Sequence, residues 1–445
     1  MNRFGTGNRM WRARFPVSDD TDCGWLHDTP GLPPSPALGG DVDADLIVIG
    51  AGFTGLAAAH RCAGLRPDWR VVVLEAQHAG AGGSGRASGF VVDQAGFVGA
   101  KPKADAGRFL RLSHAGIAAL DHARTRFDID CDWDDRGWLH IAASDAGVQG
   151  LASLTPWLES IGRRYEHLDR AALRRLTGTD FYRAAVRMPG SVLVHVGKLV
   201  HGIAAALPES VALYQHTPVT SIETRDGEVI VSTPAATVRA SRVVVALNAY
   251  APMLGLLRDR LFPLVTFGSL TRPLTSAEQD LLGDEPEWGL LAQDPMGSSL
   301  RRTRDQRLLI RNTIHYTRDA SAAASVRQNA VAEHRKALTA RWPSLADIEL
   351  ESTWAGPMGT TPSLRPFFGR IARGLVTAGA FTGAGIAMGT VLGRLMVDEL
   401  LGVESPLLTD ARRLTPPNRL PPEPFLSPGI TWKTKQMNAS AGAAL

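Results

Sequence analysis

Residues 46–55 read Leu-Ile-Val-Ile-Gly-Ala-Gly-Phe-Thr-Gly, and this stretch decides the fold. The continuous apolar run at 46–49 is typical of a parallel strand that is buried on both faces. The Gly-x-Gly-x-x-Gly at 50–55 follows directly, and an alanine-rich segment at 54–64 reads as a helix. The first glycine permits a tight turn, the second lets the backbone approach a pyrophosphate, and the third lets helix and strand pack closely.

A second apolar run at 70–74 predicts the next buried strand, and Glu75 follows at its end. Strand, glycine motif, helix, strand and acid in this order are typical of a dinucleotide-binding β-α-β unit. The pyrophosphate would lie at the helix N-terminus, where unpaired N–H groups and the helix dipole favour an anion. The Glu75 carboxylate would accept hydrogen bonds from ribose hydroxyls and repel a 2′-phosphate. The alternative is a glycine-rich turn that binds no ligand. It does not explain why strand, glycine motif, helix, strand and acid follow one another in this order.

A second glycine cluster, Gly-Ala-Gly-Gly-Ser-Gly-Arg-Ala-Ser-Gly at 80–89, favours FAD over NAD. Such a loop can run its backbone along an extended cofactor, with Ser84 and Arg86 reaching phosphate or flavin oxygens. A simple NAD dehydrogenase has no need for it. A flexible surface loop is the alternative interpretation.

A third cluster at 382–386 (Thr-Gly-Ala-Gly-Ile) precedes a helix that we expect to run to about residue 401 and to stop at Gly402. Gly385, Gly389 and Gly393 recur every four residues, so they share one helix face. This stripe predicts close packing against either a cofactor or another backbone.

Composition excludes several classes of protein. The 445 residues, 44% of them apolar, suffice for two domains with sizeable cores. The net charge of +4 comes without a long basic run, so we expect no nucleic-acid partner. Cys23, Cys62 and Cys131 lack Cys-x-x-Cys spacing, so we expect neither disulfides nor a metal site. With no secretory signal and no apolar run long enough to span a membrane, the chain reads as a cytoplasmic protein.

The pattern changes along the chain. Strand patterns at 242–246 and 374–378 extend the first sheet, whereas strand patterns at 137–141 and 307–310 lie in aromatic-rich stretches that look like an inserted domain. The predicted fold class is therefore α/β, a Rossmann-like FAD-binding domain with an inserted α+β substrate domain that contains a mostly antiparallel sheet. The expected organisation is an irregular leader at 1–40, the FAD-binding domain at 41–100, 191–255 and 350–402, the substrate domain at 101–190 and 256–349, and an extended tail at 403–445.

With these motifs the chain resembles the FAD-dependent D-amino-acid oxidase superfamily, and within it most closely the gamma-glutamylputrescine oxidase branch beside the glycine and sarcosine oxidases. The resemblance covers about residues 20–402. It also rests on motifs at 45–55, 84–86, 137–139, 195–199, 301–309, 354–356 and 382–386. By this resemblance, the FAD contacts would be Gly50, Gly52, Phe53, Thr54, Gly55, Glu75, Ala76, Gly83, Ser84, Arg86, Ala87, Ser88, Phe90, Val219, Gly383, Ala384, Gly385 and Ile386.

The FAD is expected to be non-covalent. Relatives that tether it use a cysteine late in the chain or a histidine in the 84–89 loop, and this sequence has neither. His195 and Lys198 match a pattern near the domain junction, and we interpret His195 as structural rather than catalytic.

Three departures from the family pattern bear on the substrate. Ala87-Ser88 replaces a usual Asn-Gly, and Ala384 stands where histidine is common. Met358 stands where amino-acid-oxidising relatives place an arginine that pairs with the substrate carboxylate. The substrate is then an amine without an α-carboxylate, or another arginine, Arg311 or Arg365, holds that group.

The resemblance implies an enzyme that oxidises a C–N bond of an amine by hydride transfer to the flavin. Molecular oxygen would be the acceptor, giving hydrogen peroxide and an imine or aldehyde. No catalytic side chain is assigned, and the sequence does not indicate the oligomeric state. Alternatives are a flavin dehydrogenase or tailoring enzyme with another acceptor, an amino-acid oxidase, and a non-enzymatic flavoprotein. The expected substrate pocket, where core packing explains each aromatic equally well, is Met358, Trp354, Phe381, Tyr316 and His315.

Overall fold

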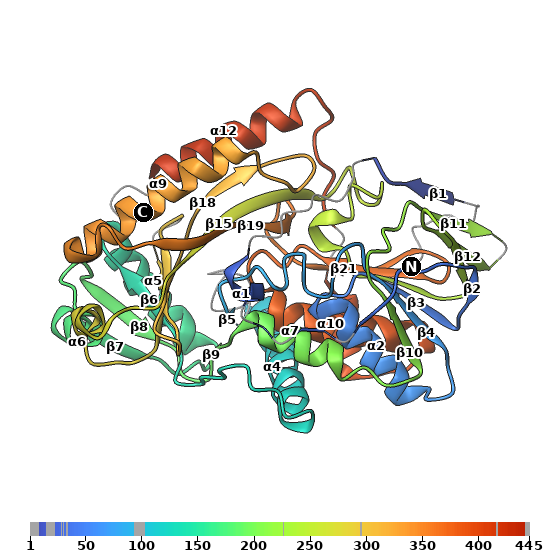
Figure 1. Cartoon of the computed structure of the whole chain (residues 1–445), viewed down its shortest axis with the longest axis horizontal. Helices are drawn as coiled ribbons and strands as arrows, with labels where there is room; N and C mark the ends of the chain where they lie inside the picture. Colours follow the sequence, from blue (N-terminus) through green and yellow to red (C-terminus); the bar gives the residue numbers. More distant parts are fainter. Residues whose placement is uncertain are drawn as a thin grey trace.

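The computed structural model describes residues 9–14, 23–27, 29, 31–32, 34–92, 103–225, 227–293, 296–414 and 417–440. Its strands form sheets of six, five and eight strands and one two-stranded pair. Figure 1 shows the six- and five-stranded sheets at one end of the molecule and the eight-stranded sheet at the other. Within the described ranges, no helix combines the length and the apolar character needed to cross a membrane.

The six-stranded sheet is the Rossmann-like sheet expected from the sequence. Its strands, in order across the sheet, are β10 (Val211–Tyr214), β4 (Val71–Leu74), β3 (Leu46–Ile49), β14 (Val243–Val245), β21 (Leu375–Gly379) and β20 (Phe367–Ala372). Neighbouring strands are parallel except β20 and β21. Every residue of β3 and β4 is buried, because both faces of the sheet are covered. The strands predicted at 46–49, 70–74, 242–246 and 374–378 are thus confirmed.

The two faces of this sheet pack against different layers (Figure 1). Val48 and Val73 point into a core shared with helices, whereas Ile49 and Leu74 point into a core shared with the five-stranded sheet. The helices are α2 (Phe53–Leu65), α4 (Lys103–Arg126), α7 (Val196–Ala205) and α10 (Gly385–Leu401). The five-stranded sheet has the order β1 (Arg9–Arg12), β11 (Ser221–Arg225), β12 (Glu228–Ser232), β13 (Thr237–Ala240) and β2 (Val42–Asp43).

The eight-stranded sheet forms the second domain, and α9 (Ala324–Arg341) covers one of its faces. Its order is β19 (Leu350–Thr360), β15 (Phe262–Thr271), β18 (Leu308–Tyr316), β17 (Ser299–Arg302), β16 (Trp288–Ala292), β6 (Leu139–Ala142), β8 (Ala184–Arg187) and β7 (Glu166–Asp169). Only the pairing of β16 with β6 is parallel, so the sheet is mostly antiparallel, as predicted.

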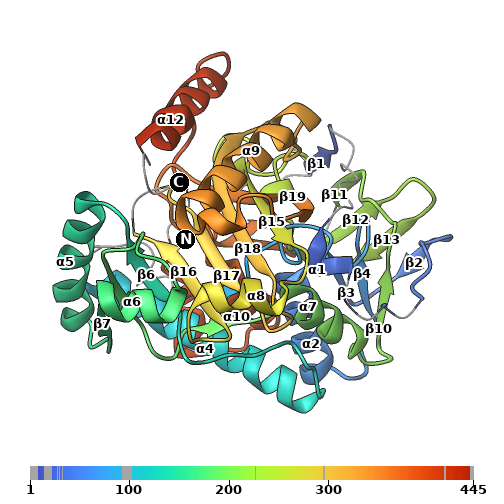
Figure 2. The same cartoon turned by 60° about the vertical axis from the view of Figure 1, so that its left-hand side comes forward.

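Shorter elements connect these layers. They are α1 (Gly24–His27), β5 (Phe90–Val91) paired with β9 (Val192–Leu193), α5 (Asp145–Ser160), α6 (Arg170–Thr177), α8 (Ser276–Gln279), α11 (Pro406–Arg412), α12 (Leu426–Ser440) and the 3-10 turns η1 (Asn248–Tyr250), η2 (Asp280–Leu282) and η3 (Pro343–Leu345). Figure 2 shows α12 at the periphery of the molecule.

The expected irregular leader at 1–40 and the extended tail at 403–445 are both wrong in part. In the leader, β1 pairs with β11, and Trp11 lies opposite Ile222. In the tail, α11 and α12 are helices. Pro428 lies in the first turn of α12, where a proline costs no intrahelical hydrogen bond, so the prolines of this region do not exclude a helix.

The expected boundary at residue 350 is also wrong. β19 begins there but pairs with β15 in the eight-stranded sheet, whereas the prediction assigned 350–402 entirely to the FAD-binding domain. Strand pairing of this kind joins segments far apart in the chain, so no local pattern in 350–360 identifies the partner sheet.

Glycines allow α10 to cross α2 at very short range. A Cβ added at Gly393 would lie 2.1 Å from the Thr54 carbonyl oxygen, and one at Gly389 would lie 2.6 Å from the Thr54 Oγ1. A Cβ at Gly385 would meet only the Phe381 ring, at 3.4 Å. The sequence predicted that this glycine stripe packs either against a cofactor or against another backbone. For Gly389 and Gly393 the neighbour is the α2 helix.

We expect Gly393→Ala to lower the free energy of unfolding by about 2 kcal/mol, because the new methyl group has no room between two backbones. Gly64→Ala, near the end of α2, is the matched control, since nothing lies within 4 Å of its added Cβ. That control should be neutral or stabilising by up to about 1 kcal/mol. Thermal unfolding of the two variants beside the wild type measures both values, and equal effects would refute the packing argument.

Candidate active site

The Gly-x-Gly-x-x-Gly turn has the geometry that its sequence predicts. Gly50 has a φ of 101°, which favours glycine. A Cβ added at Gly55 would lie 1.8 Å from the Gly50 carbonyl oxygen, so only glycine lets α2 start this close to β3. The N-cap of α2, Gly52, has no side-chain cap. The first N–H groups of α2 therefore point to the carboxyl edge of the sheet, where α/β folds bind ligands.

Glu75 lies beside this turn at the end of β4. Its Oε2 accepts the Ala51 N–H at 2.8 Å, and its Oε1 accepts the Gln77 N–H at 3.1 Å. Burial raises the pKa of the Glu75 carboxyl. The Thr217 N–H donates to the Glu75 carbonyl at 2.8 Å, which brings the segment that contains Val219 to the same place. Glu75 is thus joined through its backbone to Thr217, two residues before Val219, a connection that the sequence did not indicate.

The 80–89 loop folds onto the start of α2. Ser84 Oγ accepts the Phe53 N–H at 3.1 Å, and a Cβ at Gly52 would lie 2.5 Å from that oxygen. The Arg86 side chain is buried and donates to carbonyls, from Nε to Ala81 at 2.7 Å and from Nη1 to Ala355 at 3.5 Å. The loop is therefore an ordered part of the site. The Arg86 side chain joins two parts of the loop to each other and joins the loop to β19.

β19 lies directly against this loop and so joins the two domains. Trp354 Nε1 donates to the Arg86 carbonyl at 3.0 Å. A Cβ at Gly83 would lie 2.7 Å from the Pro357 carbonyl oxygen, and one at Gly356 would lie 3.4 Å from the Arg86 carbonyl oxygen. The indole of Trp354 therefore anchors the loop, and the adjoining face of the eight-stranded sheet is held over it.

The second glycine-led helix, α10, starts from a turn with unusual backbone angles. Ala380, Thr382 and Gly383 have φ values of 59°, 46° and 90°. Asn248 Oδ1 accepts the Ala380 N–H at 2.9 Å and holds this turn. Sequence reasoning missed Asn248, although its place just after the buried strand β14 marks it as an edge residue of a parallel sheet. Phe381 is buried in the core with α10.

Neither glycine-led helix has a capping side chain at its own N-cap position, which is Gly52 in α2 and Ala384 in α10, although Ser84 Oγ accepts the first N–H of α2. Five other helices each have one, from Ser144, Asp169, His195, Thr275 and Ser405. Uncapped helix N-termini offer free N–H groups to an anion. The tight glycine turn, the Glu75 carboxylate and these two helix starts lie at the carboxyl edge of the parallel sheet, where α/β folds bind dinucleotides.

The register of the eight-stranded sheet decides which predicted pocket residues meet. Leu264 of β15 lies opposite both Met358 and Tyr316, so these two side chains share one face. Gly268 lies opposite both Trp354 and Arg311, on the same face. Because Trp354 contacts the Arg86 loop, this is the face that meets the cofactor domain; we call it the inner face.

His315 does not belong to the predicted pocket. It lies opposite Val265, whose side chain packs with Ala330 of α9 on the other face of the sheet. The cause is a β-bulge at Thr313, which has a φ of 58° and is skipped in the pairing of β18 with β15. One extra residue reverses the alternation of side chains, so Arg311 and Tyr316 share a face and His315 does not.

The two candidate arginines differ in their partners. Arg365 Nη1 pairs with Asp105 at 3.0 Å. Arg311 is half-buried, and its Nη2 donates to Ser299 Oγ at 3.1 Å. Among the described residues no carboxylate lies within ion-pair distance of Arg311, and burial lowers its pKa to about 10. The inner face thus carries a cation without a counterion.

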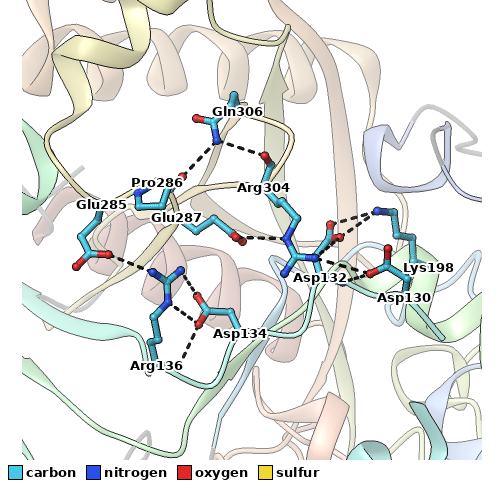
Figure 3. A network of polar contacts seen from close by, with 10 residues as sticks. All are labelled: Asp130, Asp132, Asp134, Arg136, Lys198, Glu285, Pro286, Glu287, Arg304 and Gln306. Atoms are coloured by element: carbon cyan, nitrogen blue, oxygen red, sulfur yellow. Dashed lines mark hydrogen bonds and ion pairs between the residues drawn. The ribbon is translucent and has the colours of Figure 1, made fainter. Parts of the chain in front are cut away.

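His195 and Lys198 lie in a polar network at the domain junction, part of which is drawn in Figure 3. His195 Nδ1 accepts the Lys198 N–H at 3.2 Å and so caps α7. Lys198 Nζ pairs with Asp132 at 3.1 Å, and Arg304 bridges Asp132 at 3.6 Å and Glu287 at 3.3 Å. This geometry supports the structural interpretation of His195.

Burial, helped by the Lys198 and Arg301 charges, lowers the pKa of His195 to about 3. The unfolded chain, with a histidine pKa of about 6.5, then binds a proton that the folded protein does not. The stability from neutral His195 is therefore complete above about pH 6.5 and is lost as the pH falls toward 3. His195→Asn keeps a cap acceptor and should flatten the fall in Tm between about pH 7 and 5. The exposed His122→Asn is the control, and curves parallel to wild type for both variants would contradict this account.

Comparisons with known proteins agree with this geometry. The sequence profile of the family described as FAD dependent oxidoreductase (DAO) matches residues 45–399. A probable oxidoreductase, OrdL, of Haemophilus influenzae is 27% identical over 373 residues, covering 81% of this chain and 83% of that protein. The gamma-glutamylputrescine oxidoreductase of Escherichia coli is 27% identical over 412 residues, covering 88% and 90%.

Among solved structures, glycine oxidase from Geobacillus kaustophilus superimposes with a TM-score of 0.72 at 22% identity, over 84% of this chain and 99% of that one. This likeness confirms the fold. The chain therefore belongs to the FAD dependent oxidoreductase (DAO) family and is an enzyme of the amine and amino-acid oxidase type.

Proposed function

We propose that this enzyme oxidises the C–N bond of an amine, with molecular oxygen as the final acceptor and with hydrogen peroxide and an imine or aldehyde as products. The observation that carries the proposal is the contact between β19 and the 80–89 loop. This contact brings Trp354 and the neighbours of Met358 on β19 against the loop that we propose to bind FAD. A substrate between the two domains would lie against both.

We propose that the pyrophosphate of FAD lies at the start of α2, its ribose at Glu75 and Val219, and its flavin against the 83–90 loop and residues 383–386. Bound FAD supplies a hydride acceptor. The three cysteines support non-covalent binding, because all are buried, and burial raises the pKa of Cys62 and of Cys131 to about 11. Thiols that stay protonated are poor nucleophiles for a tether. Cys62 and Cys131 form no disulfide in the described part of the chain, which supports a reducing, cytoplasmic location.

The inner face supports an amine as the reacting group. An amine donates a hydride from its α-carbon more readily when it is neutral, and an apolar lining lowers the pKa of a bound amine. Met358 and the ring of Tyr316 provide such a lining, and their shared row fixes where a carbon chain can lie. The protein's part is to orient the carbon and to exclude water.

We further propose that the substrate carries a carboxylate away from the reacting carbon, bound by Arg311. The thioether of Met358 cannot pair with a carboxylate, whereas the Arg311 guanidinium has two-pronged geometry and no carboxylate within ion-pair distance among the described residues. Arg311 lies opposite Gly268 of β15, and Met358 lies opposite Leu264. These two β15 positions are four residues apart, which corresponds to about 13 Å along the strand. The substrate in the name of the Escherichia coli relative, gamma-glutamylputrescine, is of this extended class.

Oxygen uptake tests the proposed acceptor. Purified holoenzyme with an ω-amino carboxylate should consume oxygen and release hydrogen peroxide in equal amounts. Turnover with an artificial electron acceptor but without oxygen uptake would instead identify a dehydrogenase of the same fold.

Arg311→Gln should raise KM for an ω-amino carboxylate about 10- to 100-fold, the loss expected for a hydrogen-bonded charge pair. An alkylamine of equal length, which has no carboxylate, should be affected far less. The exposed Arg258→Gln serves as the control in the same steady-state assay. An equal rise in KM for both substrates would mean that Arg311 does not bind the carboxylate.

Glu75→Ala should raise the Kd for FAD about tenfold or more, because the variant loses a charged acceptor at the turn. Titration of the apoprotein with FAD, followed by flavin fluorescence, measures this change. Glu228→Ala, at an exposed position of β12, is the control. An unchanged Kd for Glu75→Ala would remove Glu75 from the cofactor site.

A further inference from the structure

The end of β18 extends beyond its neighbour in the sheet. β17 pairs with residues 308–311 of β18 and not with residues 312–316. The C-terminal helix α12 packs along this free edge (Figure 1). The Asn438 side chain takes the place of a strand there, since its Nδ2 donates to the Ile314 carbonyl at 2.9 Å and its Oδ1 accepts the Ile314 N–H at 3.4 Å. The helix thus satisfies a backbone edge that would otherwise be open.

A second contact joins the first turn of α12 to a pocket residue. Tyr316 Oη lies 3.3 Å from Ser427 Oγ, and the Tyr316 ring meets Phe262 edge-on. Arg318 holds Ser427 in place through a hydrogen bond of 3.0 Å and pairs with Glu423 at 2.9 Å. Ser427 Oγ also donates to the Glu423 carboxylate, so Ser427 is held by Arg318 from the β18 side and by Glu423 from its own side, next to the Tyr316 hydroxyl.

The second half of α12 also lies near this strand end, where it packs against β18. Burial, with a smaller contribution from the Lys435 ammonium, lowers the pKa of His315. Lys435 and Asn438 lie in the second half of α12, and Ser427 lies in its first turn. The helix therefore follows residues 314–316 along most of its length.

Tyr316 connects this packing to the substrate. It shares the outermost row of the inner face with Met358, with Leu264 between them, whereas Arg311 lies further in. We propose that α12 is the outer wall of the substrate site and limits substrate length, with Ser427 and Asn438 as positioning residues that act through Tyr316 and Ile314. This inference rests on the proposed amine oxidation.

Three variants of the full-length holoenzyme test the wall. Tyr316→Phe and Ser427→Ala each remove the same hydrogen bond, so each should raise kcat/KM for a long ω-amino carboxylate relative to a short one by about three- to tenfold. The Tyr316→Phe/Ser427→Ala double variant should behave like Ser427→Ala alone, because the Tyr316–Ser427 bond is already lost in that variant, whereas Ser427→Ala also removes the bonds of Ser427 to Arg318 and Glu423. Gln436→Ala, at an exposed position of the same helix, is the matched control and should leave the length preference at its wild-type value.

Hydrogen exchange gives a readout that is independent of turnover. Asn438→Ala should speed exchange in a peptide that covers residues 312–318, because the Ile314 amide loses its acceptor. Gln436→Ala, at an exposed position of the same helix, should leave that exchange unchanged.

The outcomes separate the two proposals. Wild-type protein that oxidises no amine would overturn the proposed function. Wild-type protein that oxidises amines, with an unchanged length preference in Tyr316→Phe and Ser427→Ala, would overturn only the role of α12. Unchanged exchange in Asn438→Ala would show that the helix does not hold the strand edge.

Discussion

The close approach of α10 to α2 is the constraint on which the rest of the site depends. Cβ atoms at Gly389 and Gly393 would lie 2.6 Å and 2.1 Å from atoms of Thr54, so any larger residue would push the helices apart. Because both helices begin at the same edge of the parallel sheet, their separation fixes the distance between two uncapped N-termini. That distance sets how far apart the two groups of a dinucleotide must lie if each contacts the N-terminus of one helix.

The second domain is placed by contacts to backbone atoms as well as by apolar packing, in which Leu309 and Trp354 join the core of the cofactor domain. Trp354 donates to the Arg86 carbonyl, and β19 approaches Gly83 so closely that no side chain fits between them. The inner face that results carries Arg301 and Arg311, and no carboxylate among the described residues lies within ion-pair distance of Arg311. A half-buried cation of this kind is costly unless a partner or solvent balances it, which supports the proposed anionic substrate group.

Local patterns in the sequence predict the elements that depend on local physics. The glycine turn, β3, α2, β4 and Glu75 follow from hydrophobic runs and from glycines that no other residue could replace. Features that depend on distant partners were not predictable. The sheet that β19 joins, the position of α12 and the face of His315 are set by pairing, and the bulge at Thr313 decides the last of these.

Anaerobic mixing of the purified flavoprotein with an ω-amino carboxylate tests the central claim most directly. The account predicts that the visible absorbance of the oxidised flavin disappears with this substrate, and at much higher concentration with an alkylamine of equal length. Absorbance that persists with every amine, or that disappears only with α-amino acids, would contradict it.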